Sequence, residues 1–289
     1  MALVNQKQRI VVTGASGQLG SELKVILEQD LSKECYFLDR KQLPLDQTML
    51  IQDILAMYQP DVIVHAGAYT AVDLAESEPV LADQVNHLAT DEIAQYCRLH
   101  GVQLIAISTD YVFDGNSSTP LTEDAAVSPI NVYGETKLKG EQAIQKWCPE
   151  AIIIRTSWVY ATFGKNFVKT MLRLMSERDS ISVINDQIGS PTSAYDLAKA
   201  IVSIINSNKW EGGLYHYSNE GEISWYDFAL AIRELKQLDC DIEAIPTTSY
   251  PTPAKRPHYS LLDKTKIKTV YGVEVPFWRD SLAACLDSL

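Results

Sequence analysis

Short apolar runs alternate with longer segments of helical periodicity along the first half of the chain. Arg9 to Thr13 is a β-branched run, and Gln18 to Gln29 follows it with apolar residues at helical spacing. Further apolar runs recur downstream, with helix-length segments between most of them: Cys35 to Leu38, Val62 to His65, Leu104 to Ser108 and Ile152 to Thr156. This alternation predicts an α/β fold in which helices cover both faces of a parallel sheet. Ligands bind such doubly wound sheets at the carboxyl ends of the strands.

The alternation becomes irregular after Trp158. The remaining elements that the pattern indicates are a helix, a final strand, a Ser-capped helix and an extended Pro-rich segment, at Tyr195 to Ile205, Gly213 to Tyr217, Ser224 to Leu235 and Pro246 to Pro257. We therefore expect a smaller C-terminal lobe that binds substrate and closes over the sheet edge. The predicted sheet domain comprises residues 1–159 and 193–219, and the predicted small lobe comprises residues 160–192 and 220–289.

Composition is that of a globular protein with a substantial core. The chain has 289 residues, of which 46% are hydrophobic and 21% are charged. A formal net charge of -12, without a dense run of Lys or Arg, argues against a nucleic-acid partner. An anionic substrate would instead need a few local cationic groups.

Cysteine spacing and hydropathy indicate the compartment. The five cysteines are scattered and odd in number, which favours reduced thiols over disulfides. The N-terminus lacks an apolar segment of signal-peptide type, and no apolar stretch reaches the roughly 18 residues that a membrane span needs. The sequence therefore predicts a cytoplasmic protein without a membrane partner.

A glycine-rich turn separates the first predicted strand from the first predicted helix. Gly14, Gly17 and Gly20 lie at the spacing that permits a tight turn, close approach of a pyrophosphate and helix–sheet contact. Gln18 and Leu19 would then begin the helix whose amide groups face that pyrophosphate. The alternative is an ordinary loop before a helix. The strand context favours a Rossmann-type dinucleotide site.

Two further segments follow strands and extend this candidate cofactor site. After Val62 to His65 comes Ala66-Gly67-Ala68, whose small residues would let a cofactor pass close to the backbone, or would serve close helix packing. After the second strand comes Asp39-Arg40-Lys41. An acidic residue at this place binds the ribose hydroxyls of NAD, whereas a neighbouring basic residue accepts the 2′-phosphate of NADP. Arg40 and Lys41 favour NADPH, with NADH as the alternative, unless they simply solvate a turn.

Tyr133 and Lys137 provide the candidate chemistry. They stand four residues apart at the start of an amphipathic helix, so both side chains share one face. The lysine ammonium can then stabilise a tyrosinate and hold a cofactor ribose. Thr109 ends the strand before this helix, where its hydroxyl would project into the crevice and hydrogen-bond a substrate carbonyl, or would merely cap the local backbone.

These residues stand within longer segments that resemble the extended short-chain dehydrogenases/reductases and, within them, the dTDP-4-dehydrorhamnose reductase family. Ser-Thr-Asp-Tyr-Val-Phe-Asp-Gly and Arg-Thr-Ser-Trp-Val-Tyr are specific to that family. The resemblance covers nearly the whole chain, through segments at Val12 to Gly20, Ala68 to Asp73, Ser108 to Gly115, Val132 to Lys137, Arg155 to Tyr160, Asp186 to Thr192, Tyr215 to Gly221 and Arg256-Pro257.

The resemblance implies a reductase and a catalytic triad. Thr109, Tyr133 and Lys137 would form the triad, with hydride passing from NADPH to C4 of a 4-keto nucleotide sugar while Tyr133 supplies the proton. It further implies substrate-binding roles for a second set of residues, Asp110, Tyr111, Trp158, Asn166 and Arg256. No catalytic metal is expected.

Some assignments stay open within this resemblance. Trp158 could instead pack in the core, and Asn166 could merely cap the following helix. The family usually continues Trp-Val-Tyr with Gly, whereas this chain has Ala161, so the loop near the sugar can bend differently. Some family members form dimers bridged by a metal through acidic side chains. A homodimer is therefore an open expectation, and no such ligands can be assigned in this chain.

Two other classes of function share this fold. Dehydratases place a second carboxylate directly after the Asp that follows the Thr, but here Asp110 is followed by Tyr111. Epimerases reuse tightly held NAD without net consumption. A regulatory subunit of methionine adenosyltransferase also resembles the family and acts as a binding partner rather than as an enzyme. The intact Thr, Tyr and Lys favour catalysis.

Overall fold

The computed structural model describes residues 7–207 and 209–289. Its centre is a six-stranded sheet in the order β10-β5-β4-β3-β1-β2. Every neighbouring pair in it is parallel. Its strands are β1 (Gln8–Thr13), β2 (Lys33–Leu38), β3 (Val62–His65), β4 (Gln103–Thr109), β5 (Ile152–Thr156) and β10 (Gly213–His216). The strand order reverses between β1 and β3, which is where doubly wound sheets open a ligand crevice.

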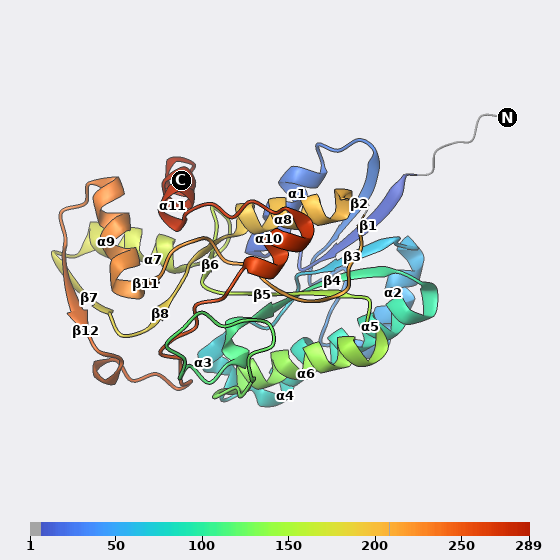
Figure 1. Cartoon of the computed structure of the whole chain (residues 1–289), viewed down its shortest axis with the longest axis horizontal. Coiled ribbons are helices and arrows are strands. Elements are labelled where there is room, and N and C mark those ends of the chain that lie inside the picture. Colours follow the sequence, from blue (N-terminus) through green and yellow to red (C-terminus); the bar gives the residue numbers. More distant parts are fainter. Residues whose placement is uncertain (1–6, 208) are drawn as a thin grey trace.

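Helices cover both faces of this sheet, as Figure 1 shows. One face packs against α1 (Gln18–Leu27) and α8 (Ala194–Asn206), with Leu23 and Ile201 in the shared core. The other face packs against α2 (Ile51–Tyr58), α5 (Ala89–His100) and α6 (Val132–Trp147). The strands are apolar on both sides because both sides are covered. The predicted doubly wound α/β fold is confirmed.

The connections on the α6 side contain shorter elements. Helix α3 (Val72–Ala75) follows the loop after β3, and α4 (Pro79–Asp83) continues through a π-helical turn, Gln84–Leu88, directly into α5. A 3-10 turn, Asp110–Val112, follows β4. Such π turns often occur at functional sites.

A second lobe lies beside the sheet, at the left of Figure 1. It holds α7 (Phe167–Glu177), α9 (Trp225–Lys236) and α11 (Trp278–Asp287) around their own apolar cluster. Its strands form three pairs: β6 (Val159–Tyr160) with β9 (Thr192–Ser193), β7 (Ser180–Ile184) with β12 (Asp241–Ile245), and β8 (Ile188–Gly189) with β11 (Ile223–Ser224). Another helix, α10 (Thr265–Tyr271), packs through Ile267 into the core of the sheet domain. The division into two domains at the predicted boundaries stays a prediction.

The predicted elements lie close to the observed ones. The strands predicted at Val62 to His65 and Ile152 to Thr156 have those limits, whereas the first helix ends at Leu27 rather than Gln29. Ser224 caps α9 through a capping box with Asp227, as its position before the helix predicted. The segment from Pro246 to Pro257 also contains a 3-10 turn, Thr247–Ser249. Among helices within the described residues, none combines the length and apolar character needed to cross a membrane.

Candidate functional site

One cavity of about 910 Å³ lies at the carboxyl ends of the strands and extends to the small lobe. This volume is near the upper end of the usual range for ligand sites. The cavity is lined by all the catalytic and substrate-binding candidates and by most of the cofactor-binding ones, with Gly20 and Lys41 outside it: Gly14, Gly17, Gln18, Leu19, Asp39, Arg40, Ala66, Gly67, Ala68, Thr109, Asp110, Tyr111, Tyr133, Lys137, Trp158, Asn166 and Arg256. The structure thus brings the set together, although their individual roles are not established by that proximity.

The glycine turn fits a dinucleotide. Gly14 has a φ of 67°, and a Cβ there would lie 2.6 Å from the backbone of Gly67. A Cβ on Gly20 would lie 2.3 Å from the Gly14 carbonyl oxygen, so α1 can approach the turn only because this residue is glycine. Gly17 is the N-cap of α1 and gives no side-chain cap. The first amide groups of α1 therefore face the cavity as donors for an anionic group.

The turn after β2 places one acidic residue, Asp39, and one basic residue, Arg40, at the rim of the cavity. Asp39 folds back on its own turn, where Oδ1 accepts the amide groups of Lys41 at 2.8 Å and Gln42 at 3.0 Å. Arg40 pairs with Asp46 at 2.9 Å, and its side chain remains 78% exposed. Lys41 is exposed and does not line the cavity. Arg40 is thus available to a phosphate on this rim, whereas Lys41 lies outside it.

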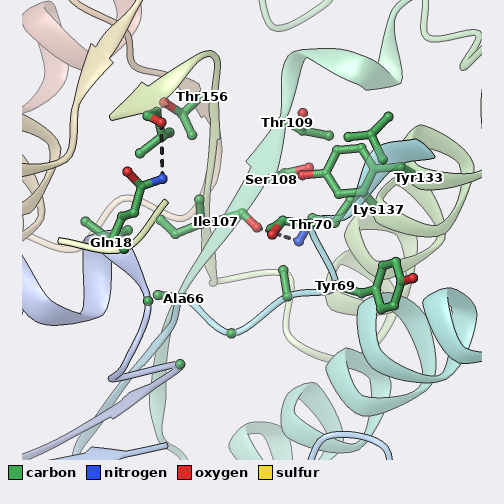
Figure 2. Close-up of a pocket in the computed structure, with 18 of the residues that line it drawn as sticks. Gln18, Ala66, Tyr69, Thr70, Ile107, Ser108, Thr109, Tyr133, Lys137 and Thr156 are labelled. Carbon is green, nitrogen blue, oxygen red and sulfur yellow. Dashed lines mark hydrogen bonds between the residues drawn. The ribbon is translucent and has the colours of Figure 1, made fainter. Parts of the chain in front are cut away.

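Helix α6 delivers Tyr133 and Lys137 into the cavity. The helix starts at Asn131, whose Oδ1 accepts the Gly134 amide at 2.8 Å. A Cβ on Gly134 would lie 2.1 Å from the Tyr111 carbonyl oxygen, so glycine lets the first turn pack against the loop after β4. Figure 2 shows Tyr133 and Thr109 on one side of the cavity, with Gln18 and Ala66 across from them.

Burial shifts the pKa values of Tyr133 and Lys137. Burial raises the pKa of Tyr133 to about 12, although a hydrogen bond with Thr109 partly opposes it and the Asp110 charge adds to it. Burial lowers the pKa of Lys137 to about 8, while the negative charge of Glu141 raises it. Lys137 Nζ donates to the Ile107 carbonyl oxygen at 2.8 Å. Perturbed groups of this kind in a cleft are typical of catalytic sites.

Thr109 accepts a hydrogen bond from the local backbone and also lines the cavity. Its Oγ1 accepts the Tyr111 amide at 3.2 Å and lies 3.1 Å from Asp110 Oδ1. Burial raises the pKa of Asp110 to about 6, and its Oδ2 has no protein partner. The Tyr111 ring meets Tyr133 edge-on, with centroids 5.5 Å apart. Local capping and a role in the cavity are therefore compatible for Thr109.

Two tryptophans form the wall of the cavity on the side of the small lobe. Trp158 has a φ of 48° and stacks on Trp225, with ring centroids 3.7 Å apart and planes 15° apart. Both rings line the cavity, as does Phe167, whose ring centroid lies 4.6 Å from that of Trp225. The sequence reasoning missed Trp225, because helical periodicity gives no sign of a partner distant along the chain.

Asn166 makes structural hydrogen bonds. Its Oδ1 accepts the Lys169 amide at 3.0 Å and caps α7, which is the alternative role that the sequence left open. Its Nδ2 donates to Gln18 Oε1 and to the Ala161 carbonyl oxygen, each at 2.8 Å. Asn166 thereby joins the small lobe to the start of α1.

Arg256 reaches the cavity in an ion pair with Asp73. Nη2 donates to Asp73 Oδ2 at 2.7 Å and Nη1 donates to Oδ1 at 3.0 Å. The pair holds the pKa of Asp73 below its ordinary value. Lys165, an exposed cation that the sequence reasoning also missed, lines the same cavity. Within the described residues, no group of three His, Cys, Asp or Glu side chains is placed to hold a metal ion.

Comparison with known proteins gives one consistent family. The model described as RmlD substrate binding domain matches residues 8–289. The dTDP-4-dehydrorhamnose reductase of Escherichia coli is 44% identical over 248 residues, which is 83% of this chain and 83% of that protein. The dTDP-4-dehydrorhamnose reductase of Aggregatibacter actinomycetemcomitans is 39% identical over 284 residues, covering 95% of this chain and 97% of the relative.

Solved structures agree with the sequence comparison. A dTDP-4-dehydrorhamnose reductase from Bacillus anthracis in complex with NADP has a TM-score of 0.93 and 36% identity, covering 98% of this chain and 100% of that one. A Thermus thermophilus UDP-glucose 4-epimerase has a TM-score of 0.79 at 19% identity, covering 97% of this chain and 98% of that one. At that identity, the second comparison shows a shared fold alone.

Proposed function

Because this chain belongs to the family described as the RmlD substrate binding domain, we propose that it reduces the C4 keto group of dTDP-4-dehydro-L-rhamnose to give dTDP-L-rhamnose. It is an NAD(P)H-dependent oxidoreductase, and NADPH is the expected reductant with NADH as an alternative. The observation that carries the proposal is that the glycine turn and the Thr109, Tyr133 and Lys137 side chains line one cavity.

The cofactor fits the residues that are present. The uncapped start of α1 and the glycines around Gly14 suit a pyrophosphate, and Arg40 suits a 2′-phosphate. When bound, the reduced nicotinamide supplies the hydride that the carbonyl carbon receives. The remaining chemistry belongs to side chains of this chain.

Tyr133 is the proposed proton donor. Burial raises the pKa of its phenol to about 12, so the phenol holds its proton at neutral pH, as a group that donates to a developing alkoxide must. The Thr109 hydroxyl would hydrogen-bond the carbonyl oxygen and favour the build-up of negative charge there. Lys137 would hold the ribose and, as a cation, ease loss of the phenol proton. These roles for the three residues are proposals.

Substrate binding uses the side of the cavity that faces the small lobe. Trp158, held against Trp225, offers an apolar face to a sugar or a base, and Tyr111 lies beside Tyr133. The Asp110 Oδ2, buried without a protein partner, can accept a sugar hydroxyl. Arg256 and Lys165 provide positive charge for the diphosphate in a chain whose net charge is -12.

The three alternative functions lack specific support. A dehydratase needs a second carboxylate beside Asp110, and Tyr111 occupies that place. An epimerase shares the fold, but it would regenerate its cofactor rather than consume it. A regulatory subunit that only binds a partner would not need Thr109, Tyr133 and Lys137 in one cavity.

The direct test follows absorbance at 340 nm, the wavelength at which NADPH absorbs, while freshly generated dTDP-4-dehydro-L-rhamnose is added. We expect about one NADPH oxidised for each sugar nucleotide consumed, and dTDP-L-rhamnose as product. NADPH binding without turnover would favour the regulatory alternative. Turnover of a nucleotide sugar without net oxidation of NADPH would favour an epimerase.

Two further expectations belong to the same proposal. The cytoplasm is the inferred compartment, because all five cysteines are free and dinucleotide cofactors are used there. The inferred assembly state is a homodimer, by resemblance to family members that form dimers. Sedimentation of the purified chain would test the second inference, and a single monomeric species at micromolar concentration would contradict it.

A further inference from the structure

Glu141 forms a buried ion pair beneath the proposed active site. Its carboxylate accepts Arg155 Nε at 2.8 Å and Nη2 at 2.6 Å, and it accepts the Ser108 hydroxyl at 2.5 Å. The side chains of Glu141 and Arg155 are only 3% and 4% exposed. The Arg155 guanidinium is the charge partner of this carboxylate, so the ion pair lies inside the protein.

The Glu141 carboxylate lies one helical turn from Lys137. Tyr133, Lys137 and Glu141 are spaced by four residues along α6, so the three side chains share one face. Glu141 does not line the main cavity, but it lines a smaller one, of about 10 Å³, together with Lys137 and Ser108. Glu141 is therefore behind the proposed active site and does not contact a ligand in the main cavity.

The same carboxylate also fixes the end of β4. Ser108 donates to Glu141, and the preceding residue, Ile107, accepts Lys137 Nζ through its carbonyl oxygen at 2.8 Å. The following residue is Thr109. Ser108 thus anchors the end of β4 to α6, directly before Thr109, and both residues line the main cavity. The pair of bonds sets the register of Thr109 relative to Tyr133.

We propose that Glu141 is a positioning residue for the reduction, because its buried carboxylate keeps Lys137 charged and holds β4 against α6. The inference rests on the proposed function for its consequence in catalysis. Its effect on the charge of Lys137 is independent of which substrate is reduced.

The other groups around Lys137 do not replace this charge. His65 on β3 is neutral because burial lowers its pKa to about 3, and His216 on β10, beside Arg155, is neutral for the same reason. Tyr133 retains its proton, and the buried Asp110 acts on Tyr133 rather than on Lys137. A unit charge roughly 6 Å away at an effective dielectric constant of about 20 shifts a pKa by about two units.

A purely structural role is the competing explanation. Breaking a buried ion pair leaves an uncompensated charge and destabilises a fold whichever partner is removed. A structural role therefore predicts that Glu141→Gln and Ser108→Ala, each of which changes a hydrogen bond at Glu141, affect the folded protein alike. A charge effect on Lys137 predicts that only Glu141→Gln lowers the titration midpoint of Lys137. The two explanations are distinguished by which variant moves that midpoint.

The test measures the titration midpoint of Lys137 in the full chain without cofactor. Lysine labelled with ¹³C at Cε reports the charge by NMR, and Lys137→Arg assigns the resonance. Glu141→Gln should lower the midpoint by up to about two pH units. Ser108→Ala removes a hydrogen bond to the same carboxylate but keeps its charge, and it is the matched control, with a midpoint close to that of the parent. Equal midpoints in the parent and Glu141→Gln, or an equal fall in Ser108→Ala, would overturn the proposal.

Activity provides a second readout. The alkaline limb of the kcat/KM profile for NADPH-dependent reduction should move with the Lys137 midpoint, to lower pH in Glu141→Gln but not in Ser108→Ala. If Glu141→Gln does not fold, Glu141→Asp keeps the charge but withdraws it by one methylene and should give a smaller shift of the same sign. Absence of that shift would also refute the proposal. The NMR midpoint remains informative if the sugar substrate is wrong, so failure of the two proposals can be told apart.

Discussion

Replacing Arg256 with alanine should raise the KM for the sugar nucleotide while leaving the affinity for NADPH nearly unchanged. Arg256 lines the cavity, and its side chain is 23% exposed. Three hydrogen bonds, two with Asp73 and one with the Ala254 carbonyl oxygen, engage its guanidinium. A guanidinium has five N–H donors, so about two remain for a diphosphate. The ion pair thus orients Arg256 without using all of its donors.

The magnitude follows from those remaining donors. A hydrogen bond to a charged group contributes about 1.5–3 kcal/mol, which corresponds to a loss of roughly 10- to 150-fold in affinity. Removing Arg256 also leaves the Asp73 carboxylate, 39% exposed, without its partner. That negative charge would repel the diphosphate, so the loss should fall in the upper part of this range. Asp73→Asn removes the negative charge of Asp73, so the KM for the sugar nucleotide should stay unchanged or fall.

Steady-state kinetics with each substrate varied in turn provides the measurement, and Arg279→Ala provides the matched control. Arg279 pairs with Glu234 at 2.8 Å in the small lobe and is not among the cavity-lining residues. Arg279→Ala makes the same change in charge as Arg256→Ala, but at a position away from the site. An unaltered KM in a folded Arg256→Ala protein would show that the residue only ties its loop to Asp73. An equal rise in Arg279→Ala would show that net charge, rather than a local contact, sets the KM.

Three other predictions test the chemistry, the cofactor and the fold. Tyr133→Phe should reduce turnover by roughly two to four orders of magnitude, because the proton donor is lost, while NADPH binding measured by fluorescence titration stays near that of the parent. Arg40→Ala should weaken the binding of NADPH more than that of NADH in the same titration, whereas Lys41→Ala, outside the cavity, should affect both affinities alike. Equal losses of the two affinities in Arg40→Ala would contradict a contact between Arg40 and the 2′-phosphate. Burial lowers the pKa values of His65 and His216 from 6.5 to about 3. Below about pH 6.5 both histidines are therefore protonated in the unfolded chain but stay neutral in the native chain. Stability measured by urea unfolding should therefore fall as pH falls, by about 2 kcal/mol for each histidine at pH 5, and a flat profile between pH 7 and pH 5 would contradict this.

Local sequence signals were sufficient for the elements that carry the site. Apolar runs gave the strands because both faces of the sheet are buried, and glycine spacing gave the turn because no larger residue fits there. The four-residue spacing of Tyr133 and Lys137 gave their common face on α6, which is a property of any helix. Asn166 had two readings in the sequence, and its hydrogen bonds support the cap. Its role toward a ligand stays a prediction.

What the sequence alone determined is the type of fold and the local elements that carry the glycine turn, Tyr133 and Lys137, because periodicity and turn chemistry act over a few neighbouring residues. Only the tertiary structure decided which of the candidate side chains are already paired. Trp158 stacks on Trp225, and Arg256 binds Asp73, which precedes it by 183 positions. The burial that sets the acidity of Lys137 likewise depends on packing between distant segments. Contacts across such separations follow from how helices and strands pack, and no local pattern of residues records them.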